Sequence, residues 1–298
     1  MSAGTRNMQP PEAARHGESE AAASGPRVLV RGVGDVGSAV AHRLFCAGFA
    51  VVLHDRPAPT TTRRRMAFAD AVFDGRASLA GCTALRVDDH AALPGLLGAR
   101  ELIAVCTGEL AALIEILRPE AMVDARMRKH DAAELQRGMA PLTVGLGPGF
   151  VVGEHVDIAV ETSWDALGRV ITAGATLALA GEPRPIAGHA RDRYVYAPTG
   201  GRFRTRCQIG DLVKEGEVVA SIDGLALGAP IAGMLRGLTR DGVPVKPRTK
   251  VLEVDPRGGA GQVAGLGERP RRIAEGVLRA IQSHPSRFGN PRGNEAAL

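Results

Sequence analysis

Residues 28–55, VLVRGVGDVGSAVAHRLFCAGFAVVLHD, contain the pattern that decides the fold of the N-terminal half of the chain. The segment opens with the apolar run Val28-Leu29-Val30 and closes with a second one, Ala50-Val51-Val52-Leu53, and both are typical of buried strands. Between these runs, apolar residues recur at helical spacing. The segment therefore predicts a strand, a helix and a second strand, which is the first unit of a parallel sheet with crossover helices.

The glycines between the first strand and the helix carry the functional hypothesis. Gly32, Gly34 and Gly37 form a GxGxxG motif in which the first glycine permits a tight turn, the second lets the backbone approach a pyrophosphate and the third lets helix and strand pack closely. Asp55 ends the second strand, where a carboxylate would accept hydrogen bonds from ribose hydroxyls. We therefore predict that these four residues bind a nucleotide cofactor. The alternative is a loop that serves only the fold.

An internal repeat organises the C-terminal part of the chain. Residues 197–204 recur, offset by 32 positions, as residues 229–236, and Asp223 recurs as Asp255 in the same register. Each copy predicts short strands separated by turns, and neither copy could bury its apolar face alone, so we expect the two to form one small β module. The repeat resembles the barrel-sandwich hybrid of biotinyl and lipoyl carrier domains. Because the connecting hairpin, residues 224–228, has no lysine, we expect no covalent biotin or lipoyl group.

These patterns predict an α/β fold class. Short apolar runs and helical patterns alternate as far as about residue 140, and the segment after it has no long helical pattern. The predicted plan is, in order, a disordered tail (1–25), a Rossmann-like parallel-sheet domain (26–140), a β-rich connecting segment (141–190), a barrel-sandwich-like β module (191–256), a C-terminal helix (257–283) and a second disordered tail (284–298).

The composition excludes several classes of protein. Apolar residues make up 45% of the 298-residue chain, which is enough for a sizeable core and excludes a wholly disordered or fibrous protein. The formal charge is +5, but the basic residues are scattered among 32 acids and only 3% of residues are aromatic, so we expect no nucleic-acid partner. No apolar stretch reaches the roughly 18 residues of a membrane span. We therefore expect no membrane association and a cytoplasmic location.

The four cysteines, Cys46, Cys82, Cys106 and Cys207, lie far apart in the sequence. They form no CxxC motif and no Cys–His cluster with ligand spacing, so we predict neither a disulfide framework nor a metal site. Cys46 lies in the first predicted helix, where we expect it in the core. Cys106 follows a predicted strand at the carboxyl edge of the sheet and is the candidate catalytic thiol, for sulfur transfer or metal binding. The alternative for Cys106 is a small buried apolar residue.

Two further segments are candidates for anion binding. Arg63 and Arg64 could hold an anionic ligand beside the glycine-rich loop, and a solvated helix start is the alternative. Gly145, Gly147 and Gly149 could form a backbone nest for an anion, and a plain turn is the alternative. No Ser-His-Asp arrangement, Cys-His arrangement or carboxylate pair is present at a defensible spacing, so the sequence leaves open whether the protein is an enzyme.

Several stretches, taken in order, resemble the YqeB-like accessory proteins of the selenium-dependent molybdenum hydroxylase system. The resemblance spans about residues 27–282. It rests on GVGDVGSAVAHRLFCAGFAVVLHD (32–55), RRRMAFADAVFDG (63–75), VDARM (123–127), GLGPGFVVGEHVD (145–157), VETSWDALGRVI (160–171) and VDPRG (254–258).

The resemblance implies a maturation factor for molybdenum-cofactor-dependent hydroxylases of the xanthine dehydrogenase type, distantly similar to the XdhC/CoxF group. It also implies the hydroxylase apo-enzyme as partner. Together with the glycine-rich loop it indicates NAD(P) or a molybdopterin dinucleotide as the ligand. An NAD(P)-dependent oxidoreductase is one alternative, and a non-catalytic scaffold whose Rossmann-like unit binds nothing is another. Oligomeric state is left open, with a homo-oligomer among the alternatives.

Overall fold

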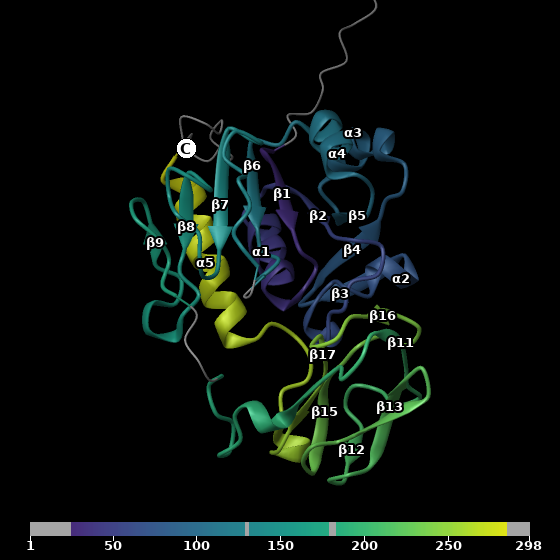
Figure 1. Ribbon diagram of the computed structural model, residues 1–298. Coiled ribbons are helices and arrows are strands. Elements are labelled where there is room, and N and C mark those ends of the chain that lie inside the picture. Colours follow the sequence, from purple (N-terminus) through teal and green to yellow (C-terminus); the bar gives the residue numbers. More distant parts are fainter. Residues whose placement is uncertain (1–24, 129–130, 179–182, 285–298) are drawn as a thin grey trace, which may run out of the picture.

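The computed structural model of the protein describes residues 25–128, 131–178 and 183–284 (Figure 1). Within these residues, a nine-stranded sheet has the order β3-β4-β5-β2-β1-β6-β7-β8-β9. Its strands are β1 Arg27–Arg31, β2 Ala50–His54, β3 Arg76–Leu79, β4 Cys82–Arg86, β5 Ile103–Cys106, β6 Ala121–Asp124, β7 Leu142–Leu146, β8 Ile158–Val160 and β9 Val170–Ile171.

The sheet is mixed. The strands from β4 to β8 pair in parallel, whereas β3 and β9 pair antiparallel at its two edges. Strand β1 lies in the middle, and its residues Val28, Leu29 and Val30 are fully buried. Val28 and Val30 pack into the core on one face, and Leu29 packs into a second core on the other. Burial on both faces explains why this strand is a continuous apolar run in the sequence.

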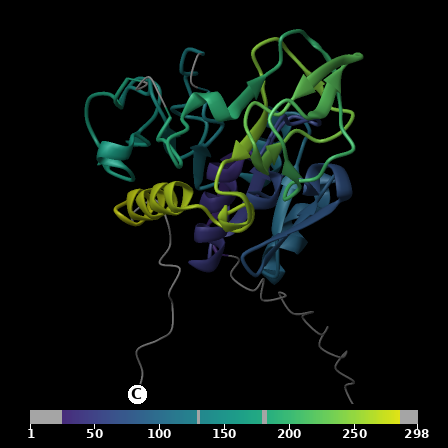
Figure 2. The same ribbon diagram turned by 90° about the horizontal axis from the view of Figure 1, so that it is seen from below.

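Helices cover both faces of the large sheet. Residues of α1 (Asp35–Cys46) and α5 (Glu268–Gln282) share the larger core with one face, and residues of α3 (Leu93–Ala99) and α4 (Leu110–Leu117) share the second core with the other. Figure 2 shows α5, in yellow, beside the purple α1. The remaining short helices are α2 Ala71–Asp74 and the 3₁₀ helices η1 Arg64–Met66, η2 His90–Ala92, η3 Trp164–Ala166, η4 Arg191–Arg193 and η5 Gly258–Ala260.

The repeat region forms a β module of two four-stranded antiparallel sheets, which lies below the large sheet in the view of Figure 1. The sheets have the orders β10-β17-β15-β12 and β14-β13-β11-β16. Their strands are β10 Tyr194–Tyr196, β11 Gly201–Arg204, β12 Leu212–Val213, β13 Val218–Ile222, β14 Leu225–Gly228, β15 Gly233–Leu238, β16 Pro244–Val245 and β17 Lys250–Asp255.

The two copies of the repeat exchange their edge strands. Strands β11 and β13 of the first copy pair with each other and are flanked by β16 and β14 of the second copy. Likewise β15 and β17 of the second copy are flanked by β12 and β10 from the first. The equivalent residues Phe203 and Leu235 are both fully buried in the common core. Each sheet therefore needs strands from both copies.

The large sheet corrects the predicted fold class. We expected a Rossmann-like parallel sheet ending near residue 140 and a β-rich connecting segment after it. This prediction is wrong, because the sheet is mixed and continues through β7, β8 and β9. The helix that covers this part of the sheet is α5, which comes from the end of the chain. The helical pattern is therefore absent from the local sequence.

The β module and the two chain ends can also be compared with the structure predicted for them. The predicted barrel-sandwich module is also wrong, since the repeat forms two separate four-stranded sheets that exchange strands. The tails expected to be disordered fall, apart from Gly25 and His284, outside the described residues. Within the described part of the chain, no helix combines the length and apolar character needed to cross a membrane.

A substitution at Gly233 tests how closely the strands of the β module pack. Its φ is +155°, and a Cβ there would lie 2.3 Å from the carbonyl oxygen of Asp255 in the neighbouring strand. Gly233→Ala should therefore lower the free energy of unfolding by about 1–3 kcal/mol, as chemical denaturation measures it. Gly259→Ala, where a Cβ meets nothing within 4 Å, is the control and should stay within about 0.5 kcal/mol of the parent. Equal stabilities for both variants would contradict the close strand packing described here.

Candidate functional site

A cavity of about 910 Å³ opens at the carboxyl ends of β1, β2, β5 and β6. The chain continues from β1 to β2, which is the neighbour of β1 on one side in the sheet. The neighbour of β1 on the other side is β6. The loops after neighbouring strands diverge at such a point and leave a crevice. The lining residues include Arg31, Gly32, Gly34, Asp35, His54, Asp55, Arg56, Thr107, Gly108, Glu109, Arg126, Met127 and Arg128.

The glycine-rich loop forms one wall of this cavity. Gly32 has a φ of +108°, and its N–H donates to the carbonyl oxygen of His54 over 2.7 Å. A Cβ on Gly37 would lie 1.9 Å from the carbonyl oxygen of Gly32, so a glycine is needed there for α1 to approach the strand. A Cβ on Gly34 would meet nothing within 4 Å. The space above Gly34 is therefore open.

The chain's own carboxylates occupy donors of this loop. Asp55 accepts from the N–H of Val33 over 2.9 Å with one oxygen and from the N–H of Arg56 over 2.8 Å with the other. Asp35 accepts from the N–H of Val36 in the first turn of α1 over 3.0 Å. A carboxylate at the start of a helix neutralises the partial positive charge that would attract a phosphate. The loop is thus less suited to a pyrophosphate than its motif suggests.

Three arginines converge on one glutamate beside the cavity. Arg31, Arg126 and Arg128 all line the cavity, and their guanidinium groups contact Glu134 at N···O distances of 3.2, 2.7 and 2.6 Å. The side chain of Glu134 is 44% exposed. The hydrogen bond from Arg126 has the largest effect on the pKa of Glu134. Burial opposes it, but the charges of the three arginines act in the same direction as the hydrogen bond and the pKa is lowered to about 2. Glu134 is therefore ionised throughout the neutral range.

Arg31 is held less completely than its two neighbours. It is 7% exposed, and its Nε atom is buried without a hydrogen-bond partner among the described residues. Burial, together with the nearby charge of Arg126, lowers the pKa of its guanidinium. A buried donor without a hydrogen-bond partner is unfavourable, and the guanidinium of Arg31 is already largely removed from water. An anion that reached Arg31 would therefore gain a hydrogen bond with little further desolvation of the arginine.

His54 presents a neutral imidazole to the same cavity. Its Nε2 lies 2.8 Å from the carbonyl oxygen of Gly108, so this nitrogen carries the proton and donates. Burial is the largest of the effects that lower the pKa of His54, so the ring is neutral at neutral pH and its Nδ1 is an acceptor. The site predicted from the sequence did not include His54. The missed signal is its position as the last residue of β2, at the carboxyl edge of the sheet.

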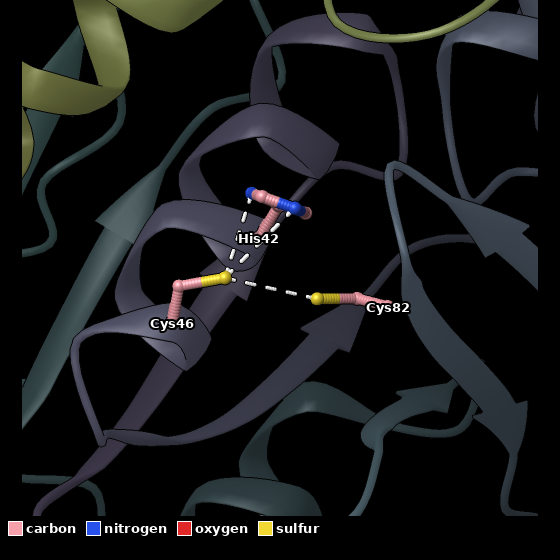
Figure 3. A group of neighbouring side chains, drawn as sticks. All are labelled: His42, Cys46 and Cys82. Carbon is pink, nitrogen blue, oxygen red and sulfur yellow. Dashed lines mark hydrogen bonds between the residues drawn. The ribbon is translucent and has the colours of Figure 1, made fainter.

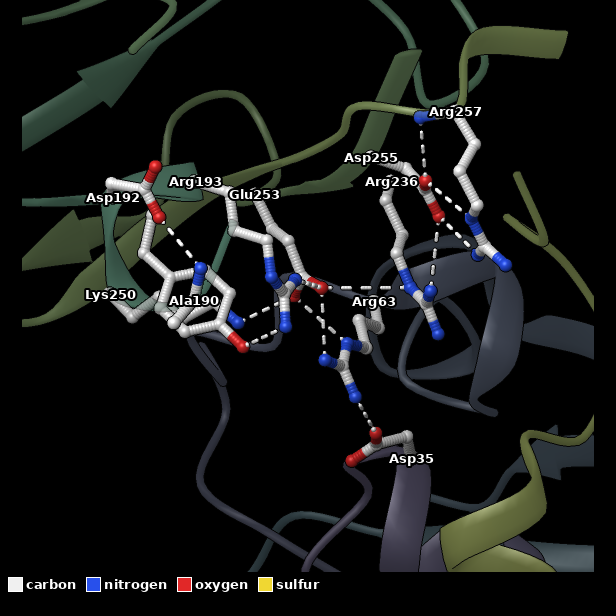
Figure 4. A network of polar contacts seen from close by, with 11 residues as sticks. Asp35, Arg63, Ala190, Asp192, Arg193, Arg236, Lys250, Glu253, Asp255 and Arg257 are labelled. Atoms are coloured by element: carbon white, nitrogen blue, oxygen red, sulfur yellow. Dashed lines mark hydrogen bonds and ion pairs between the residues drawn. The ribbon is translucent and has the colours of Figure 1, made fainter. Parts of the chain in front are cut away.

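Arg63 and Arg64, the candidates for binding an anionic ligand, instead bind carboxylates of the chain itself. Figure 4 shows the contacts of Arg63. Arg63 donates to both oxygens of Glu253 over 2.9 Å and to Asp35 over 3.0 Å. Arg64 donates to both oxygens of Asp70 over 2.8 Å. These arginines do not line the cavity. Arg63 ties the β module, through β17, to the start of α1.

Glu253 is the centre of this network. It is fully buried, and Arg193 and Lys250 contact it in addition to Arg63. Burial by itself would raise the pKa of Glu253, but the charges of Arg63 and Lys250 and their hydrogen bonds outweigh burial and hold it well below its ordinary value. For Lys250, burial has the opposite sign: it lowers the pKa to about 8, although the negative charge of Glu253 opposes this effect. The ammonium group of Lys250 lies 3.8 Å from the centre of the Tyr194 ring.

The glycines of the predicted nest serve packing. Gly145 lies in β7, and a Cβ there would lie 2.5 Å from the ring of Phe150. Gly147 and Gly149 adopt φ values of +108° and +86° in the turn that brings Phe150 back onto the strand. None of the three glycines lines the large cavity.

The structure also changes the roles predicted for the cysteines. Cys106 is fully buried in β5, and burial, followed by the charge of Asp88, raises the pKa of its thiol to about 12. It is thus poorly suited to serve as a thiolate. Cys46, expected in the core, is exposed. Contrary to the expectation of no Cys–His cluster, the ligand atoms of His42, Cys46 and Cys82 lie within 4.8 Å of one another.

The comparison with known proteins extends the resemblance seen in the sequence. No protein-family profile matches the chain. The chain is 39% identical over 257 residues to the "Uncharacterized protein YqeB" of Escherichia coli strain K12. The match covers 85% of this chain and 47% of that protein, so the chain spans about half the length of the curated relative. Over this span the chain is similar to YqeB.

Solved structures similar to the chain have different descriptions. They include the product-bound ectoine utilization protein EutE (DoeB) from Ruegeria pomeroyi, at 14% identity, with 78% of this chain and 85% of that chain covered and a TM-score of 0.24. A succinylglutamate desuccinylase/aspartoacylase from Rhodobacter sphaeroides matches at 16% identity over 78% and 85% of the two chains, with a TM-score of 0.25. Matches at this level assign no activity to the chain.

The function expected from the sequence is corrected. No comparison bears out a molybdenum hydroxylase maturation factor or a nucleotide-binding Rossmann-like unit, and none bears out the two alternatives, the NAD(P)-dependent oxidoreductase and the scaffold. These predictions are wrong. For the loop, the physical reason is that carboxylates of Asp35 and Asp55 already occupy its donors. The absence of covalent biotin or lipoyl groups and of nucleic-acid and membrane partners stays a prediction.

The reactivity of the cysteines separates Cys106 from Cys46. In the folded protein at pH 8, reduced and treated with a metal chelator, iodoacetamide should leave Cys106 unmodified, because its thiol is buried and protonated. The exposed Cys46 should react. Mass spectrometry of proteolytic peptides after quenching measures both, and the unfolded protein, in which both should react, is the control. Fast modification of native Cys106 would restore it as a reactive candidate.

Glu253→Gln tests the buried network. The substitution keeps the shape of the side chain but leaves Arg63, Arg193 and Lys250 without their buried counter-charge. Removing one partner from a buried ion pair costs about 3–5 kcal/mol, so we expect a loss of that size in the free energy of unfolding. Glu275→Gln, which removes the exposed pair with Arg43, is the control and should cost about 1 kcal/mol or less. Similar losses in the two variants would show that the network is not central to stability.

Proposed function

We propose that the protein binds a small organic anion in the cavity at the carboxyl ends of β1, β2, β5 and β6. The observation that carries the proposal is the convergence of Arg31, Arg126 and Arg128 at one side of a cavity of about 910 Å³. Planar guanidinium groups recognise carboxylates and phosphates through paired hydrogen bonds. The cavity volume is within the range of about 300–1,000 Å³ typical of small-molecule sites.

Glu134 indicates which chemical group the three arginines bind. Its carboxylate already holds the three guanidinium groups together from outside the cavity wall, at N···O distances of 2.6–3.2 Å. It is nearly half exposed, so it can be displaced more easily than a buried partner. An incoming carboxylate or phosphate would therefore compete with Glu134 for the same donors. The segment carrying Glu134 would change its contacts as the ligand binds.

The rest of the cavity suggests how the ligand body is held. The open space above Gly34 lets a ligand approach the backbone of the loop. His54 offers a neutral acceptor at Nδ1, because its Nε2 hydrogen is held by Gly108. A ligand that carries an anionic group at one end and a hydroxyl or amino group at the other fits these features.

Arg126 and Glu134 give opposite expectations for anion binding. Calorimetric titration at low ionic strength with inorganic phosphate and with citrate measures the affinity. Arg126→Gln should weaken binding about tenfold or more, because a hydrogen bond to a charged group contributes about 1.5–3 kcal/mol. Glu134→Gln should strengthen binding, because it removes the competing carboxylate.

The control for these variants is Glu115→Gln, which makes the same charge change on an exposed position of α4. It should leave the affinity within about twofold, since exposed charges at a distance are screened by salt. Three results would each overturn the proposal: no binding of either anion, equal effects of Glu134→Gln and Glu115→Gln, or unchanged binding by Arg126→Gln.

A further inference from the structure

His42, Cys46 and Cys82 form a cluster at the far end of α1 from the cavity (Figure 3). His42 and Cys46 are four residues apart on α1, so both side chains lie on one face of the helix. Cys82 comes from the first residue of β4. The helix begins at the cavity wall and ends at Cys46, about 16 Å away at a rise of about 1.5 Å per residue. The cluster is therefore separate from the anion site.

Two contacts of the cluster fit edges of a tetrahedral metal site, and all its ligand atoms lie within 4.8 Å of one another. The Cys46 and Cys82 sulfur atoms are 3.8 Å apart, and both ring nitrogens of His42 lie 3.9 Å from the Cys46 sulfur. With Zn–S bonds of about 2.3 Å and Zn–N bonds of about 2.0–2.1 Å, a tetrahedral ion holds two sulfurs about 3.8 Å apart and a sulfur and nitrogen about 3.6 Å apart. A disulfide would require the sulfurs to approach to about 2.05 Å.

The hydrogen bond of His42 matches the outer contacts of metal-binding histidines. Its Nε2 lies 3.1 Å from the carbonyl oxygen of Ala80 and therefore donates to it. In the neutral ring, Nδ1 is then the nitrogen with a free lone pair. Histidines that ligate metals usually donate their other ring N–H to a carbonyl or carboxylate, which fixes the tautomer and the ring orientation.

The turn between β3 and β4 supplies both Ala80 and Cys82. Ala80 and Gly81 have φ values of +49° and +85°, so this two-residue hairpin has both central residues in the left-handed region. An alanine in that region costs about 1–2 kcal/mol. The same tight turn directs the carbonyl of Ala80 to His42 and places Cys82 opposite Cys46.

We propose that His42, Cys46 and Cys82 bind one Zn²⁺ ion, with a fourth position open to water or an external ligand. Thiolates and an imidazole favour zinc over magnesium or calcium, which prefer oxygen ligands. Binding forms two Zn–S bonds and one Zn–N bond, and the two thiol protons pass to solvent. The ion would join α1 to the β3–β4 hairpin at the edge of the large sheet. From the sequence we had predicted no metal site.

The experiment uses the full chain, reduced and stripped of metal. Titration with Zn²⁺ against a chromophoric chelator should give one equivalent, and Co²⁺ in its place should give thiolate-to-metal charge-transfer bands in the near ultraviolet. Cys46→Ser and Cys82→Ser should each weaken Zn²⁺ binding by at least the roughly 10–100-fold that loss of an outer partner costs. Cys46 is exposed, so its substitution should leave the fold intact.

Cys207→Ser is the matched control, because Cys207 is a free cysteine of the β module outside the cluster. It should bind Zn²⁺ like the parent. The proposal is overturned if the reduced parent binds no Zn²⁺, if Cys46→Ser binds it as tightly as Cys207→Ser, or if the Co²⁺ spectrum has no thiolate bands. A disulfide-linked peptide joining Cys46 and Cys82 after exposure to air, together with no Zn²⁺ binding after reduction, would instead identify these two cysteines as a redox pair.

Discussion

The contact between Arg63 and Glu253 is the interaction on which the arrangement of this protein depends. The two side chains share two hydrogen bonds of 2.9 Å, and the carboxylate of Glu253 is fully buried. A buried carboxylate without its counter-charges would be strongly unfavourable, so the β module is held where Arg63 can reach it. Because Arg63 also binds Asp35, the position of the module is coupled to the first turn of α1.

Helix α1 connects the two sites that the structure suggests. Its first turn contributes to the cavity wall, and its last residue, Cys46, contributes to the cysteine–histidine cluster. The helix is held on one side by Gly37, whose lack of a side chain lets it approach β1, and on the other by α5. Its position is therefore fixed by packing along most of its length, and both sites have a rigid support.

Arginine side chains bind the chain's own carboxylates in both polar clusters, but with different consequences. Around Glu253 the carboxylate and the guanidinium of Arg193 are buried and Arg63 is only partly exposed, which suits a structural role. Around Glu134 the carboxylate is exposed and the arginines reach a cavity. The same residue types thus serve stability in one place and suit ligand exchange in the other, and the difference is set by burial alone.

The sequence by itself determined the elements that depend on local pattern. The strand–helix–strand unit of residues 28–55, the tight turn at Gly32 and the 32-residue repeat could be read directly, because apolar spacing and glycine positions act over a few residues. Only the tertiary structure decided which charges meet. Arg31 and Glu134 are 103 positions apart and Arg63 and Glu253 are 190 apart. The edge strands exchanged between the repeats, and the helix that covers β7 and β8, depend in the same way on chain folding that no local pattern encodes.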